Sequence, residues 1–351
     1  MSLTTATTAE QIRAVHQARH TGRGREVVVT TILLVAILAA FALSLSIGDF
    51  AVPIPDVLGA LVGRGDTGTH FIIIELRLPR ALTAVCVGLA LGLAGAVFQA
   101  LLRNPLASPD MIGVTQGASV GAVLASITFG ISGIALSFAA LAGAVVTSTL
   151  IYALAWQRGV AGYRLILVGI GVAGALSSIV SYLLTSSDVT VSQDALVWLT
   201  GSLNGSSLEQ FWPLLGALVV LLPLTALASL TLPVLQLGDD TAAGLGVPVE
   251  RSRRALLGCA VGLTGVAVAA AGPVAFVAFV AGPVARRLLP TKGAALVQAA
   301  LIGALLMLVA DFAAQHLLWS SQFPVGVVTS LIGAPYLLWL LSRANRIGKG
   351  G

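Results

Sequence analysis

Few residues of this chain have a type and spacing that could do chemistry. A loop that binds the phosphates of ATP reads GxxxxGK[ST], but both lysines, Lys292 and Lys349, are followed by glycine. We therefore expect no Walker A loop, and the chain is not predicted to be an enzyme. Cys86 and Cys259 lie in apolar segments, where packing is expected rather than a disulfide or a metal site. No bound metal or cofactor is predicted.

Asp311 is the one carboxylate that lies well inside a long apolar segment. Ionisable residues at membrane depth mark proton or ion pathways in secondary transporters, so Asp311 is a candidate proton relay. The same side chain could instead accept hydrogen bonds from a neighbouring helix or backbone. Because this acid is alone, the structural role is favoured.

The elements that must position these residues are membrane helices. Of 351 residues, 57% are hydrophobic and 9% are charged, against roughly 25% charged in average soluble domains. A mean hydropathy of +0.98 leaves too little polar surface for a globule in water. Apolar segments recur from Val27 to Leu341, and the basic residues lie between them. The fold class is therefore an all-α polytopic membrane protein, which excludes a soluble enzyme, a nucleic-acid-binding protein and a secreted disulfide scaffold.

A helix needs roughly 20 apolar residues to cross the hydrocarbon core. The first candidate is too long for the apolar region of a signal peptide and is followed by further spans, so we expect it to be retained. A short re-entrant or surface helix is also expected around 193–199. In all, about ten transmembrane helices are predicted, at 27–47, 81–102, 111–130, 134–155, 165–185, 211–232, 255–272, 274–289, 294–318 and 326–342.

An even number of spans puts both termini on one side of the membrane. If that side is the cytoplasm, every Lys and Arg except Arg64, Arg77 and Arg80 lies on it, as the positive-inside rule requires. The predicted organisation is a cytoplasmic N-terminal tail, a single ten-helix transmembrane domain and a cytoplasmic C-terminal tail. Their ranges are 1–26, 27–343 and 344–351.

Glycines recur at four-residue spacing in three of these segments. On a helix this spacing clears a groove in which a neighbouring backbone can approach closely. We therefore expect tight helix packing at three sets of glycines: Gly88 and Gly92; Gly113, Gly117 and Gly121; and Gly258 and Gly262.

Three longer motifs are more specific. Segment 77–121 reads RLPRALTAVCVGLALGLAGAVFQALLRNPLASPDMIGVTQGASVG, segment 237–254 reads LGDDTAAGLGVPVERSRR, and segment 322–341 reads QFPVGVVTSLIGAPYLLWLL. In this order and at these separations they closely resemble the FecCD-type permeases of bacterial ABC importers, which carry ferric siderophores, haem or vitamin B12. The resemblance extends over nearly the whole chain from Val27. The SPDMIG and VARRL motifs look most like the ferric-enterobactin-like permeases.

This resemblance implies the type II ABC importer permease fold with ten helices per subunit. It also implies a second permease subunit (an identical copy or a paralogue), two cytoplasmic ABC ATPase subunits and an extracytoplasmic substrate-binding protein. ATP and Mg would be held by the ATPase subunits. The implied location is the bacterial cell (inner) membrane, in contact with lipid. The implied function is the ATP-driven import of a ferric siderophore.

In the resemblance, Arg77 and Arg80 correspond to a pair that docks the binding protein at the outer mouth. Their i,i+3 spacing puts both on one helix face, where guanidinium groups can pair with carboxylates. Alternatively, they are helix-end arginines that snorkel to the membrane interface. A third docking arginine would fall at Gln315, beside His316, so the docking charge is smaller in this chain.

The resemblance places two further sites on the cytoplasmic side. The inner gate is expected at Asn104, Leu106, Gly162 and Tyr163, although the last two depart from the small hydroxyl residues of the family and Asn104 also suits an ordinary turn. The loop 237–254 is expected to couple to the ATPase, and its aspartates could equally serve only as favourable charges at a helix N-terminus. The coupling residues are Gly238, Asp239, Asp240, Thr241, Ala242, Ala243, Gly244, Leu245 and Gly246.

Alternatives to siderophore import stay open at this point. The same importer class could carry vitamin B12 or haem. A different class is an ion-coupled secondary transporter that uses Asp311, against which the lack of a second intramembrane acid and the 237–254 loop argue. The third alternative is a membrane scaffold without transport activity.

Overall fold

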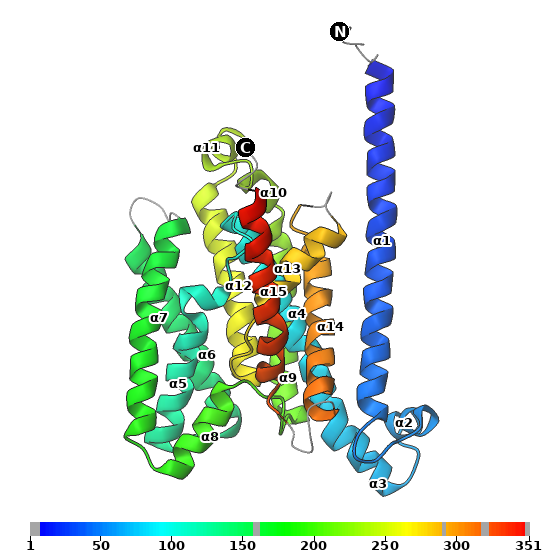
Figure 1. The fold of residues 1–351 in the computed structure, drawn as a ribbon, viewed down its shortest axis with the longest axis vertical. Coiled ribbons are helices and arrows are strands. Elements are labelled where there is room, and N and C mark those ends of the chain that lie inside the picture. The colour runs from blue at the N-terminus through cyan, green and yellow to red at the C-terminus, as the bar shows by residue number, and fades with distance from the viewer. Residues whose placement is uncertain (1–7, 157–161, 290–292, 317–322, 348–351) are drawn as a thin grey trace.

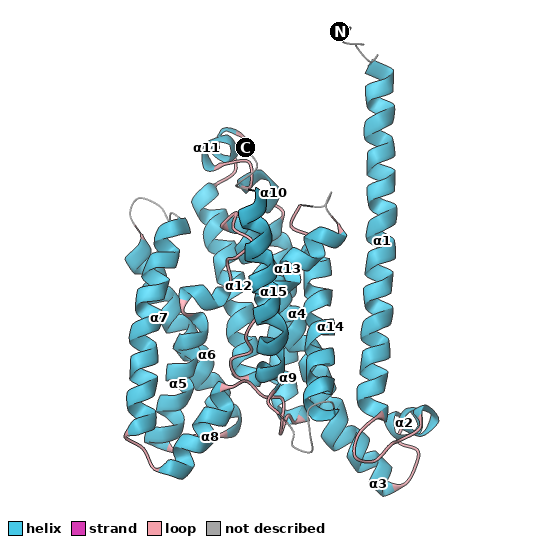
Figure 2. Cartoon of the chain, viewed as in Figure 1, coloured by secondary structure: helices cyan, strands magenta, loops and turns pink. Residues whose placement is uncertain are grey.

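The computed structural model describes residues 8–156, 162–289, 293–316 and 323–347. Within these ranges the chain is a bundle of helices without strands (Figure 2), so the all-α prediction is confirmed. Both lysines considered above, Lys292 and Lys349, lie outside the described residues, as do the ends of the two predicted tails. The rest of the predicted N-terminal tail is helical from Thr8.

Each of the ten predicted apolar segments forms a helix (Figure 1). In chain order these are α1 (Thr8–Ser46), α4 (Leu78–Leu101), α5 (Val114–Phe129), α6 (Gly133–Ala155), α7 (Gly162–Thr185), α9 (Leu208–Ser229), α12 (Val249–Ala271), α13 (Val277–Leu288), α14 (Leu296–His316) and α15 (Val325–Ile347). The shorter elements are α2 (Ile54–Leu61), α3 (Thr67–His70), η1 (Phe71–Arg77), η2 (Pro109–Ile112), α8 (Val189–Leu199), α10 (Leu232–Leu235) and α11 (Asp239–Gly244). α8 contains the short helix expected around 193–199.

Seven helices in the described part of the chain are long and apolar enough to cross a membrane, judged by length and composition. One of them, Thr67–Leu101, joins α3, the π-helix η1 and α4 into a single continuous helix of 35 residues. α13 has only 12 residues, about 18 Å of helix, and is shorter than the predicted span 274–289. The chain is therefore a multi-pass membrane protein, and the count of ten crossings stays a prediction.

α13 is short because the chain is not helical between α12 and Val277. Irregular backbone at membrane depth needs partners inside the protein, and this segment has them. The Ser202 amide donates to Ala271 O at 2.8 Å, and a Cβ at Gly201 would lie 2.3 Å from Pro273 O. Phe276 adopts a positive φ of 67° just before the helix begins. The loop after α8 thus packs against the non-helical segment between α12 and α13.

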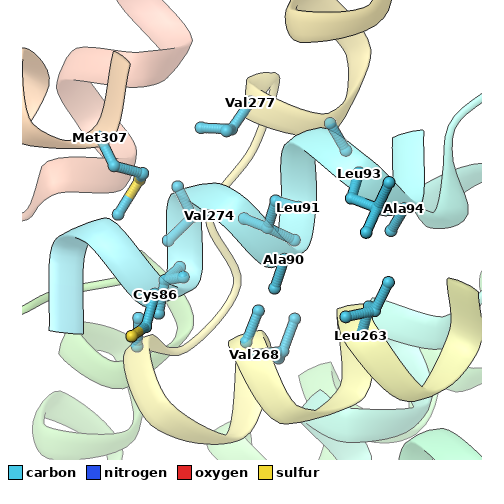
Figure 3. Close-up of a cluster of buried hydrophobic side chains, with 14 of the residues drawn as sticks. Cys86, Ala90, Leu91, Leu93, Ala94, Leu263, Val268, Val274, Val277 and Met307 are labelled. Carbon is cyan, nitrogen blue, oxygen red and sulfur yellow. The ribbon is translucent and has the colours of Figure 1, made fainter. Parts of the chain in front are cut away.

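α4 forms the centre of the bundle. In the continuous helix that contains it, 83% of the most apolar window is buried in the protein, against 11% for α1. α12, α13 and α14 surround it. Figure 3 shows Ala90 and Leu91 of α4 near Val268 of α12, with Met307 of α14 on the other side. A helix that is apolar all round is enclosed in this way.

Two of the three predicted sets of glycines lie where helix backbones meet. A Cβ at Gly88 would lie 2.4 Å from Gly303 O, so α4 and α14 touch through their backbones. Gly117 of α5 meets Gly143 of α6 in the same way, since a Cβ on Gly143 would lie 2.2 Å from Gly117 O. Close packing at these sets is confirmed. Gly258 is different, because a Cβ added there would meet no atom within 4 Å.

Candidate functional site

The described bundle has polar clusters at its two ends, which we name the α3 end and the α11 end after the short helices there (Figure 1). At the α3 end lies a cavity of about 510 Å³, here called the outer cavity after the side of the membrane on which the sequence predicts it. Apolar and polar side chains line it. The charged and polar ones include residues from the loop after α1, from η1, from α4 and from α14: Asp49, Glu75, Arg77, Arg80, Asp311, Gln315 and His316. The structure therefore brings Asp311 next to Arg77 and Arg80, from which it is more than 200 residues away in the sequence.

Arg77 is held by the chain that follows α1. Its Nη1 donates to Leu45 O at 2.7 Å and its Nη2 donates to Phe50 O at 2.5 Å. A Cβ at Gly48 would lie 2.4 Å from Nη2, so only glycine leaves room for the guanidinium. The π-helical turn of η1 ends at Arg77, and such turns often occur at functional sites. Both recorded partners of Arg77 are neutral carbonyl oxygens.

Arg80 is bonded to Asp311 of α14. Arg80 Nε lies 3.1 and 3.0 Å from the two carboxylate oxygens, and Nη2 lies 2.8 Å from Oδ1. The side chains are only 13% and 4% exposed. Gln315 adds a hydrogen bond from Nε2 to Asp311 Oδ2 at 2.7 Å. The intramembrane carboxylate is thus fully engaged by a neighbouring helix, and one of the two expected docking cations is neutralised within the chain.

At the α11 end, Asp239 connects three parts of the chain. Arg253 Nη2 of α12 lies 2.8 Å from Asp239 Oδ2, and Arg103 Nη2, just after α4, lies 3.5 Å from Oδ1. Arg253 also pairs with Glu250 at 2.8 Å. Asp239 is the first residue of α11, and its side chain makes these ion pairs rather than a capping hydrogen bond. The aspartate therefore anchors the start of the short helix to the bundle.

Most of the expected coupling loop is exposed. Ala242 is buried and attaches α11 to the bundle, whereas Asp240, Thr241, Ala243, Gly244 and Gly246 are exposed. Two leucines on this loop, Leu237 and Leu245, are each 63% exposed. Exposed leucines beside small residues form a surface on which another protein can pack closely.

The four residues expected at the inner gate each make local contacts in the structure. Asn104 Oδ1 accepts a hydrogen bond from Leu106 N at 2.9 Å, which is the turn geometry that the sequence allowed for. Gly162 is the first residue of α7, and Tyr163 is 65% exposed with Arg164 5.9 Å from its ring centre. No hydrogen bond within the described residues joins the two pairs.

A buried polar pair near the same end was missed from the sequence. Gln99 of α4 is 2% exposed, its Nε2 donates to Phe279 O at 3.0 Å, and its Oε1 accepts from Arg286 Nη2 at 3.0 Å. Gln99 and Arg286 line a cavity of about 440 Å³ together with Arg103 and Asn104. The available signal was an amide inside the apolar segment 81–102, since a polar group in such a segment needs a partner.

Among the described residues, no group of three or more His, Cys, Asp or Glu side chains is placed to hold a metal ion. The two cysteines are free thiols, with Cys86 buried in the core. In the polar clusters described above, the carboxylates of Asp311 and Asp239 are paired with arginines.

Curated proteins similar to this chain are permease subunits. The chain is 42% identical to the ferric enterobactin transport system permease protein FepG of Escherichia coli over 323 residues, which cover 92% of this chain and 98% of FepG. It is 37% identical to the iron(3+)-hydroxamate import system permease protein FhuG of Bacillus subtilis, covering 93% of this chain and 99% of FhuG.

Solved structures show the same fold. A chain from an inward-facing structure assigned to the metal-chelate type of ABC transporter superposes with a TM-score of 0.78 at 31% identity, covering 89% of this chain and 97% of that one. PsaBC from Streptococcus pneumoniae, at 16% identity and a TM-score of 0.56, covers 82% of this chain and 94% of its own and shares the fold alone. The FecCD transport family matches residues 34–343. The chain therefore belongs to the FecCD transport family.

Proposed function

We propose that this chain is the permease subunit of an ATP-driven importer that moves a ferric siderophore into the cytoplasm. The observation that carries this proposal is the 42% identity to FepG, the ferric enterobactin permease protein, over 98% of its length. Vitamin B12 or haem is the alternative cargo within the same class. The chain binds no cofactor in this proposal, since ATP and Mg belong to the partner subunits.

The α11 end faces the cytoplasm in this proposal, and the α3 end faces outward. The distribution of Lys and Arg supports this orientation, because only Arg64, Arg77 and Arg80 fall on the outer side. Single cysteines at positions 66, 20 and 348 test it with a membrane-impermeant thiol reagent. We expect labelling from outside only at position 66. Opposite labelling of the two termini would contradict an even number of spans.

The loop 237–254, which contains α11, then serves as the contact with one of the two ABC ATPase subunits of the transporter. Its small exposed residues and two exposed leucines support close packing against another protein, and the ion pairs of Asp239 hold it in a defined place. Asn104, Leu106, Gly162 and Tyr163 are proposed to narrow the cytoplasmic exit. A second permease subunit, identical or paralogous, completes the pathway.

The outer cavity is the proposed docking site of the substrate-binding protein. Arg77 is the better docking cation, because its hydrogen bonds go to neutral carbonyls and Asp49, which lines the same cavity, acts on it only through space. Arg80 is already paired with a carboxylate, so a partner would have to compete with Asp311 for it. Docking through Arg77 therefore requires less rearrangement.

An ion-coupled carrier is the competing class of function, and Asp311 decides between them. Both oxygens of the Asp311 carboxylate are already hydrogen-bonded to Arg80, and Gln315 donates to one of them, so the group is occupied in a structural ion pair. In membrane vesicles that contain the whole transporter, ATP and a proton gradient can be supplied separately while uptake of ferric enterobactin, haem and vitamin B12 is measured. We expect ATP alone to drive uptake of the ferric siderophore. Uptake driven by the gradient without ATP would overturn the proposal.

A further inference from the structure

A groove of about 350 Å³ runs between α6 and α12 near the α11 end of the bundle. Most of its lining is apolar, with Val145 of α6 and Leu257 and Val261 of α12 among the residues that form it. Ser148 and Thr149 also line it, but their hydroxyls donate to carbonyls of α6 itself, Ala144 O and Val145 O, each at 2.7 Å. The other polar residues, Tyr152 and Arg254, lie toward the end of α6 and the start of α12. The groove thus has an apolar length and a polar end.

The apolar length is left open by the protein itself. Gly258 lines it, and a Cβ added to Gly258 would meet no atom within 4 Å. Gly88 and Gly117, which share the four-residue spacing of Gly258 and Gly262, are closed by another helix backbone. The described part of this chain supplies no such helix at Gly258. Apolar surface of this kind is normally covered by lipid or by protein.

Side chains at the polar end of the groove can form hydrogen bonds with a ligand. The Tyr152 hydroxyl is buried and has no hydrogen-bond partner in the described structure. Arg254 is exposed, and its one recorded hydrogen bond runs from Nε to Glu250 O at 3.3 Å. Glu250 lies in the same region; Arg253 pairs with its Oε1 at 2.8 Å, and its Oε2 is buried without a hydrogen-bond partner. Arg251, Arg253 and Arg254 outnumber the nearby carboxylates of Glu250 and Asp239, so this end of the groove carries a net positive charge.

The aromatic residues indicate the depth of the polar end. Tyr152 and Trp156 close the α6 helix, with ring centres 5.7 Å apart, and Trp156 is 42% exposed. Tyr and Trp gather where membrane meets water, at the level of the lipid headgroups. Arg254 and Tyr152 thus lie at headgroup depth, and Val145, Gly258 and Val261 lie deeper, at the depth of acyl chains.

We propose that this groove binds an anionic phospholipid, with one acyl chain against α6 and α12 and the phosphate between Arg254 and the Tyr152 hydroxyl. The complementarity of charge favours an anionic headgroup, since a guanidinium makes short charge-assisted hydrogen bonds to phosphate. The hydroxyl would gain the partner that it lacks. This lipid site requires only that the chain is inserted in a membrane. The proposed function adds that the lipid lies in the cytoplasmic leaflet.

The test uses the full chain, purified with the subunits that remain attached and stripped of lipid, and two probes with identical acyl chains: phosphatidylglycerol and phosphatidylcholine. Native mass spectrometry measures how much of each probe stays bound. We expect phosphatidylglycerol to bind more tightly, and Arg254→Gln to weaken it about tenfold, as expected for the loss of a charged hydrogen bond. Arg251→Gln is the matched control, because Arg251 is exposed on the same helix and does not line the groove.

A second pair of variants tests the apolar length. Gly258→Leu should fill the groove and weaken both probes, whereas Gly216→Leu, at an exposed glycine of α9 that also has no atom within 4 Å, should weaken neither. Tyr152→Phe should reduce the preference for phosphatidylglycerol without lowering the unfolding temperature of the stripped protein, because the hydroxyl has no partner there.

Two results would overturn the proposal while leaving the importer function intact. One is equal binding of both probes that Arg254→Gln does not change. The other is efficient crosslinking of Gly258→Cys between two chains in membranes rich in phosphatidylglycerol, which would show that a second copy covers the groove. Failure of ATP-driven uptake, by contrast, would overturn the proposed function and leave the lipid site standing.

Discussion

Arg80 and Asp311 form a bidentate ion pair that ties α4 to α14 inside the outer cavity, although they are 231 residues apart in the sequence. The backbones of the same two helices already touch at Gly88 and Gly303. Charge pairing at one end and glycine packing along the contact thus join the central helix to α14. Arg80, which the sequence predicts to dock a partner, therefore also holds two helices of the bundle together.

Breaking this pair should destabilise the protein. Asp311→Asn keeps the size of the side chain but leaves the half-buried Arg80 without its counter-charge. Breaking a fully buried pair costs about 3–5 kcal/mol, and the cost here should be smaller because Arg80 lines a cavity. We expect a lower unfolding temperature in detergent, while the protein that folds retains ATP-driven uptake. The double variant Arg80→Gln with Asp311→Asn should recover part of the loss, because no charge is then unpaired. Equal stability of the wild type and Asp311→Asn would contradict a buried ion pair.

Close contact between α4 and α14 predicts a strong effect at Gly303. Gly303→Val would place a Cβ 2.1 Å from Gly88 O and 2.9 Å from Gly92 Cα, so the helices must separate. Overpacking of this kind costs about 1–3 kcal/mol or more. Thermal unfolding of Gly303→Val is the measurement, and Gly216→Val, at a glycine with open space around it, is the control. If both variants unfold at the same temperature, the helices are not in contact as described.

Asp239 should matter for transport more than for stability. Its ion pairs with Arg103 and Arg253 are partly exposed, so Asp239→Asn should change the free energy of unfolding by only about 0–1 kcal/mol. Because it anchors the start of α11, we expect ATP turnover in the assembled transporter with reduced uptake. Asp240→Asn is the matched control, since Asp240 is exposed beside it and outside this pairing. Wild-type uptake per ATP in Asp239→Asn would show that the anchor is dispensable.

A bulky residue in α11 should have a related effect. Gly244 is exposed at the end of this helix and has no atom within 4 Å of a Cβ, so Gly244→Trp leaves the fold of the permease intact. If α11 packs against an ATPase, the larger side chain should lower uptake and ATPase stimulation together. Wild-type uptake by Gly244→Trp would remove this loop from the coupling contact.

The two outer arginines should differ in docking. Arg77→Glu should weaken the binding protein severalfold at low salt, since a charge near the surface contributes about 0.2–1 kcal/mol and reversal adds repulsion. The substitution also removes the hydrogen bonds to Leu45 O and Phe50 O, so the unfolding temperature is measured alongside the affinity. Arg80→Gln should instead lower stability, because it leaves Asp311 unpaired. Surface plasmon resonance with the purified binding protein separates the two effects, and Arg64→Glu, at an exposed loop residue, controls for overall charge. An unchanged affinity of Arg77→Glu would return Arg77 to the role of an interfacial, snorkelling residue.

The sequence by itself determined the class of fold and the places of its helices. Apolar segments near 20 residues and four-residue glycine spacing are local patterns, and local patterns suffice because each membrane helix satisfies its own backbone. The close approaches at Gly88 and Gly117 follow from this spacing. The motifs between Arg77 and Leu341 predicted the family, and the match over residues 34–343 confirmed it.

Only the tertiary structure decided which side chains meet. The sequence presents Arg77 and Arg80 as equivalent cations on one helix face, but the fold gives Arg77 carbonyl partners and Arg80 a carboxylate from another helix. Gly258 has the same spacing as Gly88, yet among the described residues no helix packs against it. A partner that lies 231 residues away depends on how the whole bundle packs, and no short-range pattern records that packing.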